Sequence, residues 1–332
     1  MRSYQAIALA GVVCLLICVP AAPAREYALL ISAGRTTADD AMINSEYWYD
    51  MLLQYRALLD EGYDDDDIFV LYGTGTNFNS RHACYQMPYN VPDYGASRAN
   101  IQAACNELAA RMTPSDFLYV WWMGHGSPSG NHLVMYIETT GESVFDYEIA
   151  NWLSPIAYDI RSASWMTCHS GGILDDLEGP RSIVMSSATF YESTYSDWLC
   201  DSVHAEFHYP ETCAWSWETP CNICGGVDAD TDDSGRVCFE EAFDYARANT
   251  AHSHPQMSDI GGLAPDTHLS QDAGVPGDVD GDGDVDLEDL AALLASYDKC
   301  EGDPDYNPNA DFSGDGCVDL TDLAILLANY GT

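Results

Sequence analysis

The chain has 332 residues, of which 47% are hydrophobic, so it can bury a substantial core in one large or two moderate domains. Acidic residues dominate the charged ones: 53 Asp and Glu stand against 12 Lys and Arg, which gives a formal net charge of −41. Such a surface repels nucleic acids and anionic membranes and disfavours both as partners, whereas clustered carboxylates can bind calcium.

The first 24 residues have the pattern of a signal peptide. Arg2 is followed by an apolar run at residues 6–19, and Ala-Pro-Ala at residues 22–24 forms a small-x-small cleavage site just before Arg25. An uncleaved membrane anchor is the alternative, but the run is shorter than the ~18–20 apolar residues that a membrane span needs. We therefore expect a secreted protein without stable membrane insertion, located extracellularly, on the cell surface or in a periplasm.

From residue 25 to residue 251, short apolar runs alternate with helical patterns. The runs predicted as buried strands are rich in aromatic or branched residues and bounded by Gly, Asp or Ser: 27–33, 67–72, 116–123, 162–168 and 182–189. Apolar residues at helical spacing predict helices at 45–61, 97–112 and 148–153. This alternation predicts an α/β fold with a mainly parallel sheet, whose functional residues gather at the carboxyl ends of strands.

Two of the predicted strands run directly into reactive side chains. Gly-His-Gly-Ser at residues 124–127 follows one strand, and Cys-His-Ser-Gly-Gly begins at Cys168, where another ends. A thiolate is a strong nucleophile, and a histidine can take the thiol proton and later donate one to a leaving amine. Spacing alone also allows a structural histidine and a packing or disulfide-bonded cysteine. The joint occurrence of both motifs at successive strand ends favours activation of Cys168 by His125.

These motifs, within residues 27–195, resemble those of the legumain family of cysteine peptidases, which has the caspase-like fold, a three-layer sandwich with a mainly parallel sheet. His-Gly-Ser at 125–127 matches the family's histidine motif, and Thr-Cys-His-Ser-Gly at 167–171 resembles its Ala-Cys-Glu-Ser-Gly nucleophile motif. The resemblance implies catalytic roles for His125 and Cys168, and an oxyanion role for the Gly126 backbone. It also implies that Asn44 orients the histidine and that Ser193 lies in the specificity pocket.

The chain departs from that family where cleavage preference is set. The family's Arg-His pair, which gives preference for asparagine or aspartate, is Glu46-Tyr47 here, and its glutamate two residues before the nucleophile is Met166. A carboxylate in place of a guanidinium reverses the charge of the pocket, so cleavage after Asn or Asp is not expected and a basic or neutral residue is.

The predicted function is a cysteine endopeptidase that cleaves peptides or proteins through a thioester on Cys168 and needs no catalytic cofactor. Resolution of the thioester by an amine instead of water would make the protein a transamidase or ligase. A non-catalytic, calcium-dependent scaffold or binding protein is a further alternative.

Cleavage of the signal peptide removes Cys14 and Cys18 and leaves ten of the 12 cysteines. In an oxidising compartment most of them should pair. Local spacing suggests two disulfides, Cys84 with Cys105 and Cys300 with Cys317. The five cysteines between residues 200 and 238 are crowded, and their pairing cannot be deduced from the sequence.

Residues 230–241 have the spacing of an EF-hand calcium loop, with a glycine at the sixth position. The predicted ligands, at positions 1, 3, 5, 7 and 12, are Asp230, Asp232, Ser234, Arg236 (through its carbonyl) and Glu241. A helix is predicted at 240–249, directly after the loop. We expect a structural rather than a catalytic ion here. An alternative is that the loop begins at Asp228 instead of Asp230. Residues 252–275, rich in Ser, Pro, Gly and Asp and without periodicity, are predicted to be a linker.

The tail, residues 276–332, contains two further loops with calcium-binding spacing, each followed by a predicted helix (287–296 and 320–329). The predicted ligands of the first loop are Asp278, Asp280, Asp282, Asp284, Asp286 and Asp289. Those of the second loop are Asp311, Ser313, Asp315, Cys317, Asp319 and Asp322. The duplicated loop–helix pattern resembles type I dockerin modules. The resemblance implies a small all-α domain with structural Ca²⁺ and a cohesin module as partner, although the tail could also be only a calcium-stabilised anchor.

Overall fold

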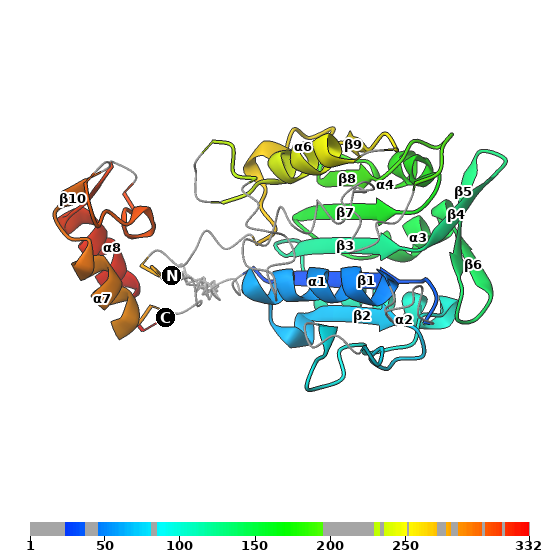
Figure 1. The fold of residues 1–332 in the computed structure, drawn as a ribbon, viewed down its shortest axis with the longest axis horizontal. Coiled ribbons are helices and arrows are strands. Elements are labelled where there is room, and N and C mark those ends of the chain that lie inside the picture. Colours follow the sequence, from blue (N-terminus) through cyan, green and yellow to red (C-terminus); the bar gives the residue numbers. More distant parts are fainter. Residues whose placement is uncertain are drawn as a thin grey trace, which may run out of the picture.

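The computed structural model describes residues 24–36, 46–80, 85–194, 229–232, 236–250, 252–270, 277–279, 285–300, 303–313 and 316–331. Within them, a six-stranded sheet forms the centre of the larger unit (Figure 1). Its strands, in spatial order, are β2 (Ile68–Tyr72), β1 (Glu26–Ser32), β3 (Phe117–Met123), β7 (Ile160–Met166), β8 (Ser182–Ser186) and β9 (Gln256–Ser258). All neighbours are parallel except β9, which runs antiparallel to β8. The predicted α/β class with a mainly parallel sheet is therefore confirmed.

Helices cover both faces of this sheet (Figure 1). On one face lie α1 (Glu46–Asp60) and α6 (Phe239–Asn249), and on the other lie α2 (Arg98–Arg111), α3 (Asp146–Leu153) and the single turn α4 (Leu174–Leu177). Successive side chains of a strand point to opposite faces, so Trp121 joins the first core and Trp122 the second. Burial on both faces explains why the strands are almost entirely apolar.

A second, smaller sheet was not expected from the sequence. The strands β4 (His125–Ser129), β5 (His132–Ile137) and β6 (Glu142–Phe145) form an antiparallel meander directly after β3. The polar sequence His-Gly-Ser-Pro-Ser of β4 has no apolar alternation, so only its pairing with β5 defines it as a strand. Gly124 separates β3 from β4 and places His125 at the first position of the meander.

The first part of the predicted linker belongs to the sheet-containing unit instead. Residues 256–258 pair with β8 as β9, and residues 264–266 form a short 3-10 helix. Leu269 is buried, and its carbonyl accepts a hydrogen bond of 2.7 Å from Tyr63 of the α1–β2 connection. A few buried apolar side chains are enough to hold this irregular segment against the core. The composition of the segment did not indicate this packing.

The C-terminal residues form a unit with its own core of buried side chains: Val279, Val285, Leu293, Ala310, Val318 and Leu326. It contains α7 (Leu287–Ala295) and α8 (Leu320–Asn329), joined by the short antiparallel strands β10 (Lys299–Cys300) and β11 (Cys317–Val318) and a 3-10 turn (Pro308–Ala310). Cys300 and Cys317 form the predicted disulfide.

The other predicted disulfide does not form. Cys105 is a free thiol on the buried side of α2, and burial raises its pKa to about 12. Its predicted partner, Cys84, lies outside the described residues, as do Cys200, Cys213, Cys221 and Cys224 of the crowded group. The predicted signal peptide also lies outside them, except for its last residue. No helix in the described part of the chain is long and apolar enough to cross a membrane.

Candidate functional site

His125 and Cys168 lie at the same edge of the central sheet. β3 and β7 are adjacent and parallel, with Met123 opposite Met166, and the two reactive residues follow these strand ends at the same distance. The backbone N–H of Gly124 donates to the Met166 carbonyl at 3.1 Å and ties the two chain segments together just below the site. The parallel register therefore places both side chains in one region.

Both side chains line one cavity of about 200 Å³. Of the residues that the structure describes, those that line it are Tyr47, Met123, Gly124, His125, Met166, Cys168 and Thr194. Cys168 is a partly buried free thiol, and its Sγ donates to the Thr194 carbonyl at 3.3 Å. Apart from the His125 imidazole, none of these described side chains can carry a positive charge, so they offer an acidic group no permanent cation.

The His125 imidazole is held by two groups from other elements. Its Nε2 lies 3.1 Å from the Tyr47 hydroxyl of α1 and 3.6 Å from Oε1 of Glu138, which follows β5. The other carboxylate oxygen of Glu138 lies 3.8 Å from Nε of Arg35. The Tyr47 hydroxyl and the Glu138 carboxylate together restrict how the imidazole ring can turn.

Gly126 is packed directly against the chain segment that carries the thiol. A Cβ atom at this position would lie 2.3 Å from the Cys168 carbonyl oxygen and 2.8 Å from Thr167 Oγ1. Real Cβ atoms do not approach other atoms so closely, so only glycine allows this contact. The close approach brings the backbone after His125 and the backbone at Cys168 together.

The residue after Cys168 turns the chain sharply. His169 has φ 61°, a left-handed conformation that is uncommon for a residue other than glycine, and a 3-10 helix (Ser170–Ile173) follows. The backbone N–H of His169 donates to the Glu192 carbonyl at 2.9 Å, and the Nδ1 atom of His169 lies 2.8 Å from the Phe190 carbonyl. The imidazole of His169 is thus engaged by the loop after β8.

The loop after β8 also positions Thr194, and the Glu192 side chain holds this loop in place. The Glu192 carboxylate accepts hydrogen bonds of 2.8 Å from the backbone N–H of Thr189 and of His254, and its other oxygen lies 2.8 Å from His254 Nδ1. Burial alone would raise the pKa of Glu192, but these backbone and imidazole donors lower it to about 2. An ionised Glu192 therefore holds the loop beside Cys168.

The remaining predicted site residues fall in different places. Tyr47 and Met166 line the cavity, whereas Ser193 is exposed and lies next to the lining residue Thr194. Asn44 and the side chain of Glu46 lie outside the described residues. Sequence reasoning missed Glu138 and Thr194: the first carries no motif, and the second could have been found only as the neighbour of Ser193.

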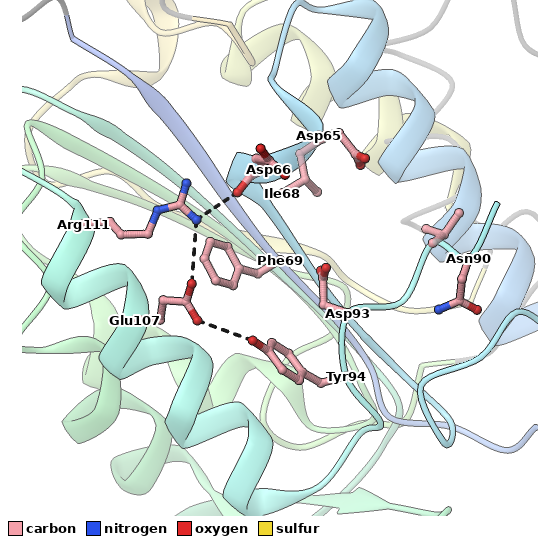
Figure 2. Close-up of a pocket in the computed structure, with 10 residues that line it drawn as sticks. Asp65, Asp66, Ile68, Phe69, Asn90, Asp93, Tyr94, Glu107 and Arg111 are labelled. Atoms are coloured by element: carbon pink, nitrogen blue, oxygen red, sulfur yellow. Dashed lines mark hydrogen bonds and ion pairs between the residues drawn. The ribbon is translucent and has the colours of Figure 1, made fainter.

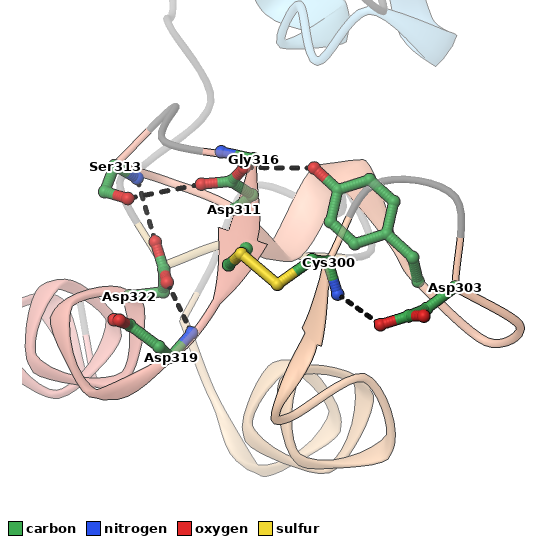
Figure 3. Close-up of a disulfide and its surroundings, with 9 residues drawn as sticks. Cys300, Asp303, Asp311, Ser313, Gly316, Asp319 and Asp322 are labelled. Atoms are coloured by element: carbon green, nitrogen blue, oxygen red, sulfur yellow. Dashed lines mark hydrogen bonds between the residues drawn. A yellow bond between two sulfur atoms is a disulfide. The ribbon is translucent and has the colours of Figure 1, made fainter.

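In the second predicted calcium loop of the C-terminal unit, Asp322 is the central hydrogen-bond acceptor (Figure 3). This carboxylate is fully buried and accepts backbone N–H groups from Ser313 at 2.8 Å and Asp319 at 2.7 Å. Asp311 accepts from the Gly316 N–H at 2.8 Å. Cys317 is in the disulfide, so only its backbone carbonyl can serve as a ligand, as position 7 requires.

The first predicted calcium loop has a similar arrangement. Asp289, at the equivalent twelfth position, is fully buried and accepts the N–H groups of Val279 and Asp286, both at 2.7 Å. A buried carboxylate without a cation is costly, so two such groups at matching positions fit bound Ca²⁺. The predicted ligands Asp280, Asp282, Asp284 and Asp315 lie outside the described residues.

The loop at 230–241 in the sheet-containing unit has the same feature: the carboxylate at its twelfth position accepts backbone N–H groups. Carboxylate oxygens of Asp230, Asp232 and Glu241 lie within 4.8 Å of one another. Glu241 accepts the N–H groups of Thr231 at 2.7 Å and Cys238 at 3.0 Å, the positions that serve Asp289 in the tail. Burial raises the pKa of Glu241, but these hydrogen bonds lower it to about 2. Ser234 lies outside the described residues.

A larger cavity, of about 310 Å³, lies beside β2 and α2 (Figure 2). Its lining includes four carboxylates and one guanidinium, that of Arg111, which donates to the Asp66 carbonyl at 2.9 Å and lies 3.8 Å from Glu107. Tyr94 donates to Glu107 at 3.4 Å. Its lining residues include no thiol, hydroxymethyl or imidazole group, so it offers no nucleophile–base pair.

Comparison with known protein families identifies the C-terminal unit. Residues 276–329 match the dockerin type I domain family, so this part of the chain is a dockerin type I domain. Domains of this type bind Ca²⁺ as a structural ion and dock onto cohesin modules. The match does not extend to the sheet-containing unit, and a search of curated proteins found no match to the chain.

Proposed function

We propose that residues 25–251 are a legumain-like cysteine endopeptidase domain of caspase-like fold, carried to its place of action by the dockerin domain at 276–332. The observation that carries this proposal is the cavity shared by the free thiol of Cys168 and the imidazole of His125. Helices on both faces of a mainly parallel sheet agree with the three-layer fold that the legumain resemblance implies.

In this proposal His125 accepts the proton of the Cys168 thiol, and the thiolate attacks the peptide carbonyl. His125 then donates the proton to the leaving amine, and water hydrolyses the remaining thioester. The Gly126 N–H stabilises the oxyanion, which its close approach to the Cys168 backbone supports. Glu138 and Tyr47 both face Nε2, so we assign Nδ1 to proton exchange with the thiol.

Cleavage specificity follows from the same cavity. Met123 and Met166 line it beside Tyr47, and these side chains give an acidic substrate group no cation to pair with. We therefore propose a basic or neutral residue, not Asn or Asp, at the cleavage point. Profiling with a peptide library tests this, and a clear preference for Asn or Asp would contradict it.

Selective alkylation tests the proposed pairing of Cys168 with His125 without any knowledge of the substrate. Iodoacetamide reacts with thiolates, so at neutral pH Cys168 of the wild type should be modified faster than Cys168 of His125→Ala. Cys105 and Cys238 serve as internal controls, because burial raises their pKa values to about 12 and about 11. Equal rates at Cys168 in both proteins would contradict activation by His125.

The dockerin domain also supports a binding role, with or without catalysis. Exposed leucines occupy equivalent positions of its two helices: Leu287 and Leu294 of α7 match Leu320 and Leu327 of α8. Such apolar side chains on a small calcium-binding unit suit docking onto a cohesin-like module. Binding to a panel of cohesins should require Ca²⁺. A non-catalytic scaffold would still bind cohesin but would not cleave peptides. A ligase would form product only when an acceptor amine is present to resolve the thioester.

We also propose secretion. The pattern of the first 24 residues, the disulfide between Cys300 and Cys317, and the dockerin domain all suit an oxidising environment outside the cytoplasm. N-terminal sequencing of the mature protein tests this, and a chain that still begins at Met1 would contradict it.

A further inference from the structure

Three metal-ligating side chains from three different elements converge outside the site described above. They are His132, the first residue of β5; Asp146, the first residue of α3; and Asp176 of α4. One potential ligand atom from each lies within 4.8 Å of the other two. The group combines an imidazole with two carboxylates, and it was not singled out by the sequence.

Asp146 and His132 are already fixed in place. Asp146 is 1% exposed, and its two carboxylate oxygens accept the N–H groups of Leu133 at 2.6 Å and Tyr147 at 2.8 Å. His132 Nδ1 lies 3.1 Å from Asp146, and its ring lies edge-on to Tyr147 with the centroids 5.0 Å apart. About half of the His132 side chain remains exposed, so an ion from solvent can reach it.

Within the described part of the chain, no Lys or Arg forms an ion pair with either carboxylate, and the nearest basic group is the His132 imidazole, 3.1 Å from Asp146. Potential ligand oxygens of Asp146 and Asp176 lie within 4.8 Å of each other, so the two carboxylates repel each other when both are ionised. Asp146 is the most buried of the three and cannot move away from Asp176 without losing its backbone hydrogen bonds. A divalent cation would relieve this repulsion directly.

We propose that His132, Asp146 and Asp176 bind a divalent cation of the Zn²⁺ type, with water completing the coordination. One imidazole and two carboxylates are a donor set that Zn²⁺ accepts, whereas Ca²⁺ prefers oxygen ligands alone. The proposal stands apart from the calcium loops and does not depend on peptidase activity.

Such an ion would link the β4–β5 pair, which begins with His125, to the segment from Cys168 to α4. β5 pairs with β4, in which Ser129 lies opposite His132 and His125 opposite Tyr136. α4 directly follows the 3-10 helix that begins two residues after Cys168. A cation held between β5 and α4 would therefore fix the meander against the segment that follows the thiol.

Titration calorimetry on the full chain, saturated with Ca²⁺ to fill the calcium loops, tests the site. The wild type should bind Zn²⁺, and Asp176→Asn or His132→Gln should weaken this binding by at least about tenfold. Asp175→Asn is the matched control: it removes the same charge from the neighbouring residue of α4, which is exposed and outside the cluster, so its affinity should fall far less than that of Asp176→Asn. Asp146→Asn is avoided because Asp146 also holds two backbone N–H groups.

A second measurement distinguishes binding at these three residues from binding at a cysteine. Co²⁺ bound at the site should give a visible spectrum without thiolate-to-metal charge transfer, and Asp176→Asn should abolish that spectrum while retaining the wild-type far-UV circular dichroism. Equal Zn²⁺ affinity in the wild type and Asp176→Asn would overturn the proposal. So would thiolate charge transfer, which would place the ion on a cysteine, or binding of Ca²⁺ but not Zn²⁺ at these residues.

Discussion

The disulfide of the dockerin domain allows a stability prediction with a defined magnitude. Cys300 and Cys317 are 17 residues apart, and the loop that they close contains the start of the second calcium loop, including Asp311 and Ser313. Replacing both cysteines by serine frees this loop in the unfolded state, and loop-closure entropy predicts a loss of about 3 kcal/mol. The core of the domain is small, so this is a large part of its stability.

Hydrogen exchange on the full chain in Ca²⁺ measures this loss locally. A decrease of about 3 kcal/mol corresponds to exchange on the order of 100-fold faster for the protected amides of α7 and α8. Amides of β3 and β7 provide the internal control and should not change. The Cys317 carbonyl survives the substitution, so Ca²⁺ should still bind. Unchanged protection in α7 and α8 would show that the disulfide does not stabilise the domain, and would refute the reasoning.

Three further predictions concern the sheet-containing unit. Gly126→Ala should abolish Cys168-dependent turnover, because its Cβ would lie 2.3 Å from the Cys168 carbonyl oxygen; Gly179→Ala, whose nearest neighbour would be 3.9 Å away, should keep it. The pKa of Glu192 is lowered from 4.5 to about 2, so its ionised form stabilises the fold. This contribution is complete above pH 4.5 and disappears as the pH falls towards 2, so the difference in Tm between wild type and Glu192→Gln should vanish over that range. Chelation of Ca²⁺ should lower the unfolding temperature seen by tryptophan fluorescence, since residues 276–332 contain no Trp. Glu241→Gln should remove this shift, and a shift of wild-type size in the variant would contradict a third calcium site.

The main strands could be predicted from the sequence because they are buried on both faces. The predicted strands at 116–123 and 182–189 differ from β3 and β8 by at most three residues at an end. Burial forces a short run of apolar residues, and polar or turn-forming residues end it. The meander had no such signature, because β4 is polar and largely exposed, and the three residues of β9 are defined only by pairing with β8.

The candidate site was predictable only where strand order determines it. Adjacent parallel strands bring their carboxyl ends together, so the proximity of His125 and Cys168 follows from the motifs after β3 and β7. Glu138 reaches the imidazole only because β5 folds back along β4, and Thr194 reaches the thiol because Glu192 and His254 hold its loop. These contacts depend on long-range packing of irregular segments, for which a single sequence contains no periodic signal.

The measurement that tests the proposed peptidase most directly is turnover of a mixed peptide library by the wild-type chain and by Cys168→Ala. Cys168 is partly buried, and within the described residues its thiol bonds only the Thr194 carbonyl, so its replacement should leave the fold intact. Cleavage by the wild type and none by a folded Cys168→Ala variant is the predicted result. Identical product profiles from the two proteins would contradict catalysis by Cys168 and leave the dockerin-linked scaffold as the function of the chain.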